Sequence, residues 1–209
     1  RREVHWMFEL ISSGGWLMMP IILCSVIAVA IIIERLWTLK KDSVAPADLV
    51  IDIEHLLEQH QLTDERLGEL EHSSYLGRIL VAGLSFSNQA PADIRRSIEE
   101  AGRHVVHELE KYLNALGTIA AITPLLGLLG TVIGMIKVFA AITAVGVGNP
   151  QILAGGISEA LITTAAGLSV GIPSLMFHRY FKGKINELTV DMEQHALRLL
   201  NLMQGNPKL

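Results

Sequence analysis

The stretch Gly155-Gly156-Ile157-Ser158-Glu159-Ala160-Leu161-Ile162-Thr163-Thr164, which continues through mostly apolar residues to Phe177, organises this chain. As a helix it is long enough to span a bilayer, because about 20 apolar residues suffice. It nevertheless carries one carboxylic acid, Glu159. An ionised side chain at the centre of a membrane helix costs about 2.5–3.5 kcal/mol on insertion scales, so its presence indicates a role in handling ions or protons. The alternative is a structural hydrogen-bonding group that desolvation keeps protonated.

The composition favours a membrane protein. The chain has 209 residues, of which 50% are hydrophobic and only 18% charged, and its mean hydropathy is +0.41. A soluble domain of this length is rarely so apolar. The net charge of −4 argues against a nucleic-acid partner. The single cysteine, Cys24, excludes a disulfide within the chain.

Two further apolar runs accompany the first. Trp16 and Trp37 flank the earlier run like interfacial anchors. A cleavable signal peptide is the alternative there, but its small-residue triplet, 28–30, lies inside the run rather than after it. The expected segments are an outer, periplasmic amino-terminal segment 1–15, span one 16–37, a cytoplasmic helical domain 38–112, span two 113–147, a periplasmic turn 148–151, span three 152–181 and a cytoplasmic carboxy-terminal helix 182–209.

Basic residues near the span ends predict the orientation. They flank the inner ends of all three spans, whereas the loop between spans two and three has none. The positive-inside rule therefore places the large polar segment and the tail in the cytoplasm and the amino terminus outside. The basic residues concerned are Arg35, Lys40, Lys41, Arg103, Lys111, Arg179, Lys182 and Lys184.

Helical periodicity extends beyond the spans. Apolar residues from Ile94 to Leu116 recur at nearly heptad spacing, and no Pro or Gly cluster separates them from span two. This pattern predicts one unbroken helix that enters the membrane. Apolar positions from Ile185 to Met203 likewise continue span three. The predicted fold is an all-α membrane protein with three transmembrane helices, of which spans two and three extend as long helices into the cytoplasm.

Small residues surround the intramembrane acid. On a helical wheel, Gly155 and Thr163 fall within about 40° of Glu159, so another helix can approach this face closely. We expect packing glycines on both spans and a lined path between Thr131 and Glu159. The expected packing glycines are Gly127, Gly130 and Gly134 in span two and Gly155, Gly167 and Gly171 in span three.

Other interpretations of these residues are also open. Threonines in membrane helices often bond their own backbone carbonyls, and that applies to Thr131, Thr163 and Thr164. Lys137 either snorkels to the outer interface or takes part in the ion pathway. His104 and His107 alone are too few for a metal site. No catalytic constellation is present, so we expect neither an enzyme nor a metal or cofactor.

Three helices are too few to shield Glu159 and Thr131 from lipid within one protomer. Several protomers in a ring remove this cost, because the small faces then turn inward or against a neighbour. We therefore expect a closed homo-oligomer. Its lumen is apolar, which predicts that it does not leak ions without a partner.

Two segments carry a family resemblance. Residues 124–135, PLLGLLGTVIGM, and residues 157–168, ISEALITTAAGL, resemble the two signature helices of the ExbB/TolQ/MotA proton-channel family. The likeness covers the whole chain, and the three-span layout resembles ExbB or TolQ rather than the four-span MotA type. The family's intramembrane glutamate and its two threonines match Glu159, Thr131 and Thr164.

The resemblance implies a homopentamer in the bacterial inner membrane around the helices of a dimeric, single-span ExbD-like partner. Such a complex uses the proton-motive force to drive a TonB-like protein in transport across the outer membrane. The alternatives are a TolQ-type subunit of the Tol-Pal system and a passive membrane scaffold. Thr164 lies about 140° round the helix from Glu159, so we expect the two to face different neighbours.

Overall fold

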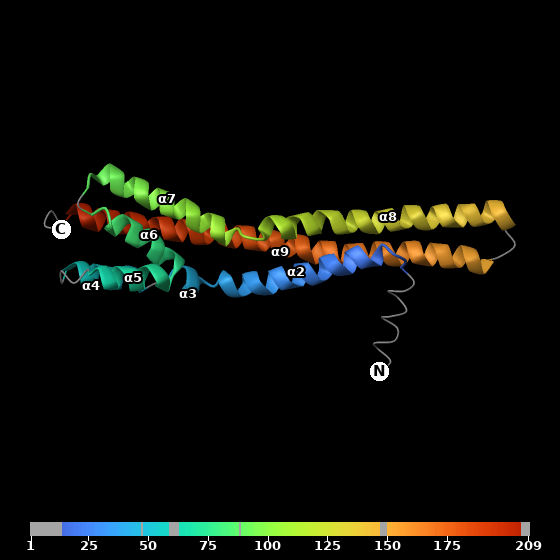
Figure 1. Cartoon of the computed structure of the whole chain (residues 1–209), viewed down its shortest axis with the longest axis horizontal. Helices are drawn as coiled ribbons and strands as arrows, with labels where there is room; N and C mark the ends of the chain where they lie inside the picture. Colours follow the sequence, from blue (N-terminus) through green and yellow to red (C-terminus); the bar gives the residue numbers. More distant parts are fainter. Residues whose placement is uncertain (1–13, 47, 59–62, 88, 147–149, 206–209) are drawn as a thin grey trace, which may run out of the picture. The chain divides into compact units, whose positions relative to one another are not determined.

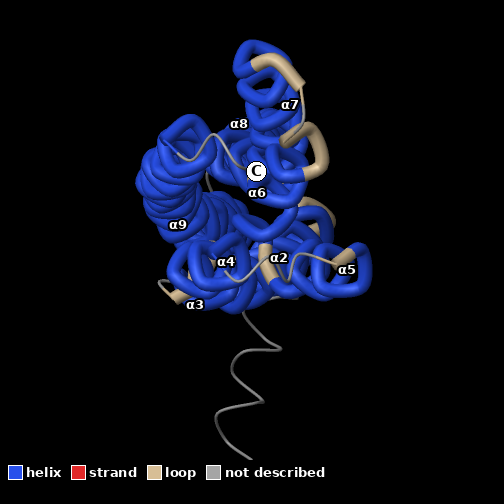
Figure 2. Tube along the Cα trace, turned by 90° about the vertical axis from the view of Figure 1, so that its left-hand side faces the viewer, coloured by secondary structure: helices blue, strands red, loops and turns tan. Residues whose placement is uncertain are grey.

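The computed structural model describes residues 14–46, 48–58, 63–87, 89–146 and 150–205. Most of the predicted outer segment 1–15 and part of the predicted turn 148–151 lie outside these residues. Within the described residues the secondary structure is helical and contains no strand (Figure 2). The described chain divides into two compact units, the first from residues 1–33 and 112–179 and the second from residues 34–111 and 180–209.

The first unit holds the apolar helices. Helix α2 (Met18–Thr38), helix α8 (Leu113–Val145) and the earlier part of helix α9 (Pro150–Gly205) build it (Figure 1). Among the described residues, three helical stretches are long and apolar enough to cross a membrane. They are Met18–Thr38 and stretches within Pro91–Ala144 and Leu153–Met203. The three expected spans are therefore present as helices.

Helix α9 follows the prediction for span three. It runs without a break from Pro150 to Gly205, so the expected span and the expected carboxy-terminal helix form one element. Pro173 lies inside the helix. The apolar stripe of its later part faces the interior of the second unit, where Ile185, Leu188 and Leu199 are fully buried.

The approach to span two departs from the prediction. Helix α7 (Pro91–Leu109) ends before the span, and α8 begins only at Leu113. Between them Tyr112 has a φ of 65°, in the left-handed region. The prediction of one unbroken helix from residue 94 into the membrane is therefore wrong. No glycine or proline marks the break, which is why the apolar periodicity conceals it.

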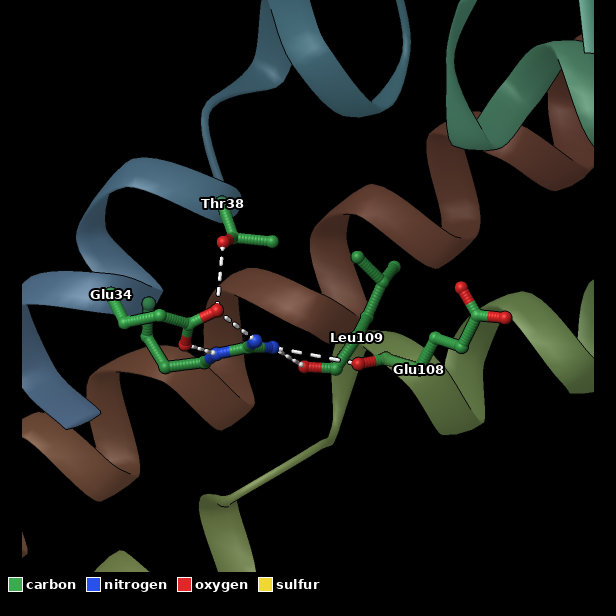
Figure 3. A network of polar contacts seen from close by, with 5 residues as sticks. Glu34, Thr38, Glu108 and Leu109 are labelled. Atoms are coloured by element: carbon green, nitrogen blue, oxygen red, sulfur yellow. Dashed lines mark hydrogen bonds and ion pairs between the residues drawn. The ribbon is translucent and has the colours of Figure 1, made fainter. Parts of the chain in front are cut away.

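Arg35 explains how α7 can end there. Its guanidinium donates to the carbonyl oxygens of Leu109 at 3.0 Å and of Glu108 at 3.5 Å, and it also pairs with the carboxylate of Glu34 (Figure 3). The last carbonyls of a helix have no partner within it and need one from elsewhere. A buried guanidinium supplies that partner for the carbonyls of Glu108 and Leu109 at the end of α7.

The second unit is a small helical domain. Besides α7 it contains α3 (Lys41–Val44), α4 (Leu49–Glu58), α5 (Asp64–Ser73) and α6 (Tyr75–Leu84). Helix α6 packs against both α5 and α7. Ser74 caps its start, because the hydroxyl oxygen accepts the backbone N–H of Gly77 at 3.0 Å. The guanidinium of Arg78 holds the carboxylate of Glu108 at 2.6 and 2.9 Å and joins α6 to α7.

Candidate functional site

Helices α8 and α9 meet along a seam of small residues. A Cβ atom at Gly130 would overlap the side chain of Thr163, and one at Gly134 would lie 2.7 Å from the Cβ of Ala160. At Gly127 a Cβ would come within 3.0 Å of the backbone carbonyl oxygen of Thr163. The three glycines of α8 therefore allow a contact that any larger residue would hold apart.

Helix α9 contributes its own glycines to the seam. A Cβ at Gly167 would strike the backbone carbonyl oxygen of Thr123, and one at Gly171 would lie 2.5 Å from the ring of Pro124. Gly155 differs from the expectation, because no atom of the described residues lies within 4 Å of the position of its Cβ. It lies near the start of α9 on an exposed side, so a Cβ there would have no packing neighbour in the part of the chain that the structure describes.

The three threonines fall into two groups. The hydroxyl of Thr131 donates to the carbonyl of Leu128 at 2.6 Å, and Thr163, 1% exposed, donates to that of Ala160 at 2.9 Å. Both bonds stay within the threonine's own helix. Thr164 instead donates across the seam to the carbonyl oxygen of Gly127 at 2.8 Å. Thr164 therefore links the two spans, whereas Thr131 and Thr163 satisfy their hydroxyls locally.

The carboxylate of Glu159 is held between two other elements. The ammonium of Lys137, on α8, lies 2.6 Å from Oε1 of Glu159. The backbone of Gly15, just before α2, approaches from another side, so closely that a Cβ there would overlap the same oxygen. Gly15 also has a φ of 69°, a conformation that glycine adopts readily and other residues resist. The start of α2 thus fits over the acid only because residue 15 lacks a side chain.

Two expectations change with this geometry. The long, flexible stem of Lys137 brings its ammonium to the carboxylate of Glu159, a contact that the sequence did not predict. Glu159 and Thr164 were expected to face different neighbours, yet both contact α8. The side chain of Lys137 comes round to the acid, so the angle between the two positions on α9 does not separate their partners.

His178 is a site residue that sequence reasoning counted only among the basic residues near the end of span three. Its Nδ1 lies 3.0 Å from the carbonyl oxygen of Leu113, at the first turn of α8. Its ring packs so closely that a Cβ at Gly117 would lie 3.0 Å from it. Gly117, one turn after Leu113, is the small residue of α8 that leaves room for this ring.

A groove in the second unit contains none of the predicted site residues. It has a volume of about 680 Å³ and lies among α6, α7 and α9. Its lining combines apolar side chains such as Ile98 and Met192 with charged ones such as Arg95 and Glu193. The lining of this groove therefore gives no support to any of the predicted site residues.

Comparison with known proteins adds to this geometry. The sequence model of the MotA/TolQ/ExbB proton channel family matches residues 71–194, which include Lys137 and Glu159. An ExbB-like biopolymer transport protein of Synechocystis is 30% identical over 174 residues, covering 81% of this chain and 82% of that protein. The biopolymer transport protein exbB1 of Vibrio cholerae is 29% identical over 202 residues, covering 93% and 86%. The Tol-Pal system protein TolQ of Haemophilus influenzae is 34% identical over 96 residues, covering 46% and 42%.

Proposed function

The chain belongs to the MotA/TolQ/ExbB proton channel family, and on that premise we propose that it is an ExbB-type subunit of a proton-driven motor. The family and the three apolar helices make it a multi-pass membrane protein with a proton-channel role rather than a member of a known enzyme family. In the proposal it works in the bacterial inner membrane with an ExbD-like single-span dimer. The complex uses the proton-motive force to energise a TonB-like protein for transport across the outer membrane.

The observation that carries the proposal is the ion pair between Glu159 and Lys137 inside apolar helices. Glu159 lies about 13 Å along α9 from its first residue, at 1.5 Å per residue. With the start of α9 at the outer edge of the membrane, as the proposed topology has it, that distance places Glu159 within a hydrocarbon core about 30 Å thick. Ionisable groups at such depths are rare and usually mark ion or proton pathways. A carboxylate there can take up a proton from one side and release it to the other.

A passive scaffold does not account for this pair. The glycine seam alone is enough to hold α8 and α9 together, since small residues let two helices pack without polar groups. An acid and a base within the membrane add a desolvation cost that a scaffold has no reason to bear. The pair therefore supports a proton-handling role, with Glu159 as the carrier and with Thr131, Thr163 and Thr164 as further polar groups of the same two helices.

The subtype rests on the extent of the similarities. The relatives from Synechocystis and Vibrio cholerae, whose names contain ExbB, match 81% and 93% of this chain. The TolQ relative matches 46%. The longer matches favour the ExbB type. A TolQ-type subunit is the alternative, and a gene for a TonB-like or a Tol-like protein beside that of the chain would distinguish them.

The proposed assembly is a homopentamer around the partner's helices, with the amino terminus periplasmic and the carboxy terminus cytoplasmic. The basic residues at the inner span ends support this orientation. Large apolar side chains of α8 stay exposed in a single chain, among them Leu125, Ile136 and Phe139. Lipid or further copies must cover them. Native mass spectrometry tests the ring, and a stable monomer or dimer would contradict it.

Proton flux into liposomes tests the function directly. The complex of this chain with its ExbD-like partner should conduct protons, and the chain alone should not. Glu159→Gln should abolish the flux while the oligomer survives, because the amide keeps the shape but carries no exchangeable acid proton. Gly183→Ala is a matched control, because the position of its Cβ is open. Flux at the wild-type level from the Gln variant would remove Glu159 from the proton path.

A further inference from the structure

The ion pair between Lys137 and Glu159 defines the surroundings of the Glu159 carboxylate. Lys137 and Glu159 come from helices whose seam is closed by glycines, and their charged atoms lie 2.6 Å apart. Lys137 is the charged group that α8 brings to this acid. The start of α2 brings the backbone of Gly15 instead of a charged side chain. Within the described residues, the charged group that contacts the carboxylate of Glu159 is the ammonium of Lys137.

The two protonation states of the pair are not equally tolerable in an apolar setting. With Glu159 ionised and Lys137 protonated, the pair is neutral overall. If Glu159 alone takes up a proton, the ammonium is left as an isolated charge, which a low-dielectric medium disfavours strongly. Proton uptake by Glu159 is therefore unfavourable unless another negative group balances the charge of Lys137.

The ammonium has capacity for another acceptor. It carries three N–H donors, and the described contacts assign one carboxylate oxygen to it. The side chain of Lys137 is 51% exposed in the single chain, against 22% for that of Glu159. An exposed ammonium at this depth calls for a covering group of opposite charge. An acidic side chain carried on an apolar helix meets both requirements, since the helix matches the surrounding surface and the acid matches the ammonium.

We propose that Lys137 is the counter-ion that holds Glu159 ionised in the free subunit, and that Glu159 is protonated when an acidic side chain on a bound apolar helix takes over Lys137. The proton comes from a hydronium ion of the aqueous phase, which becomes water, and ends on a carboxylate oxygen of Glu159, while Lys137 stays protonated throughout. Lys137 thus acts as a positioning residue for the proposed proton carrier. This inference rests on the proposed function for the identity of the bound helix.

Carbodiimide labelling tests the first part of the proposal, that Lys137 holds Glu159 ionised in the free subunit. Dicyclohexylcarbodiimide is apolar and reacts with protonated carboxyl groups in membranes, and mass spectrometry locates the adduct. In the purified oligomer at neutral pH, Glu159 should label slowly. Lys137→Met should speed its labelling several-fold, because an unpaired carboxylate in an apolar site takes up a proton. Lys137→Arg should keep the slow rate, because it keeps the charge. Lys184→Met, which removes an exposed ion pair with Glu187, should leave the rate unchanged.

The second half is tested in the complex with the ExbD-like partner. Wild-type Glu159 should label faster there than in the free subunit, and replacement of the partner's intramembrane acid by its amide should restore the slow rate. The counter-ion role of Lys137 would be overturned if Lys137→Met left the labelling of Glu159 at the wild-type rate. It would also be overturned if Lys137→Arg sped the labelling as much as Lys137→Met. If replacing the partner's acid left the labelling rate of Glu159 in the complex unchanged, the proposed transfer of Lys137 from Glu159 to that acid would be overturned. Absence of proton flux despite the Lys137→Met effect would instead count against the proposed function alone.

Discussion

The guanidinium of Arg35 donates a hydrogen bond to the carbonyl oxygen of Leu109 at 3.0 Å, and so the end of the first apolar helix caps the helix that precedes span two. Arg35 is only 3% exposed and also pairs with Glu34 (Figure 3). The cap stabilises the interruption between helices α7 and α8, which the periodicity of the sequence does not predict. The end of α7 therefore depends on a single buried side chain.

Replacing Arg35 with Met should destabilise the second unit by about 2–3 kcal/mol, since hydrogen bonds to charged groups contribute about that much and their loss leaves the carbonyls at the end of α7 unbonded. Thermal unfolding in detergent measures the change. Arg66→Met is the control, because its side chain is 61% exposed and its pair with Glu69 lies at the surface. That variant should shift stability by less than about 0.5 kcal/mol. Equal effects from both would show that Arg35 is not a cap.

The seam makes a second prediction through Gly167. A Cβ there meets the backbone of Thr123 and Gly127 rather than a movable side chain, so Gly167→Ala should cost about 1–3 kcal/mol by overpacking. Gly155→Ala provides the contrast, because its Cβ meets open space and alanine favours a helix by up to about 1 kcal/mol. Unfolding of both variants in the same detergent measures the difference. A neutral Gly167 variant would mean that the two helices are free to separate.

The left-handed conformation of Tyr112 gives a third prediction. Gly and Ala variants both remove the side chain, so their difference isolates the backbone conformation. Tyr112→Gly should be more stable than Tyr112→Ala by about 1 kcal/mol, because residues with a Cβ are disfavoured at positive φ. Chemical unfolding compares them. If the two variants were equally stable, the break between α7 and α8 would not require this conformation.

Leu188 tests the buried stripe of α9. It is fully buried in the second unit, so Leu188→Asp places a carboxylate in the core without a partner and should prevent stable folding or oligomer formation. Asn186→Asp adds the same charge at an exposed position of the same helix and should be tolerated. The yield of oligomer from size-exclusion chromatography compares the two. A normal yield from the Leu188 variant would contradict the observed packing.

Several features were predictable from the sequence because their causes are local. The apolar runs predict the three spans, since crossing hydrocarbon depends on the length and composition of a contiguous segment. The cap at Ser74 and the helix that begins at Pro91 follow from residue types that favour helix starts. The continuity of α9 likewise follows from a periodic pattern without a break. Such signals need no knowledge of the rest of the fold.

The candidate site was predictable only in part. Glu159 is evident because an acid in an apolar run is unusual. The contacts that the residues near Glu159 make were not evident from the sequence. Thr163 and Thr164 are adjacent in sequence, yet one bonds within its helix and the other crosses to α8. That choice depends on how the two helices cross, which no short segment specifies.

The sequence by itself thus determined that this chain is a three-span helical membrane protein with one acid within its third span. Only the tertiary structure decided that Lys137 pairs with that acid, that Gly15 closes over it and that α7 stops before span two. These relationships join residues from 22 to 144 positions apart. They depend on the register in which the helices pack, and that register is set by many weak contacts together rather than by the residues of any one stretch.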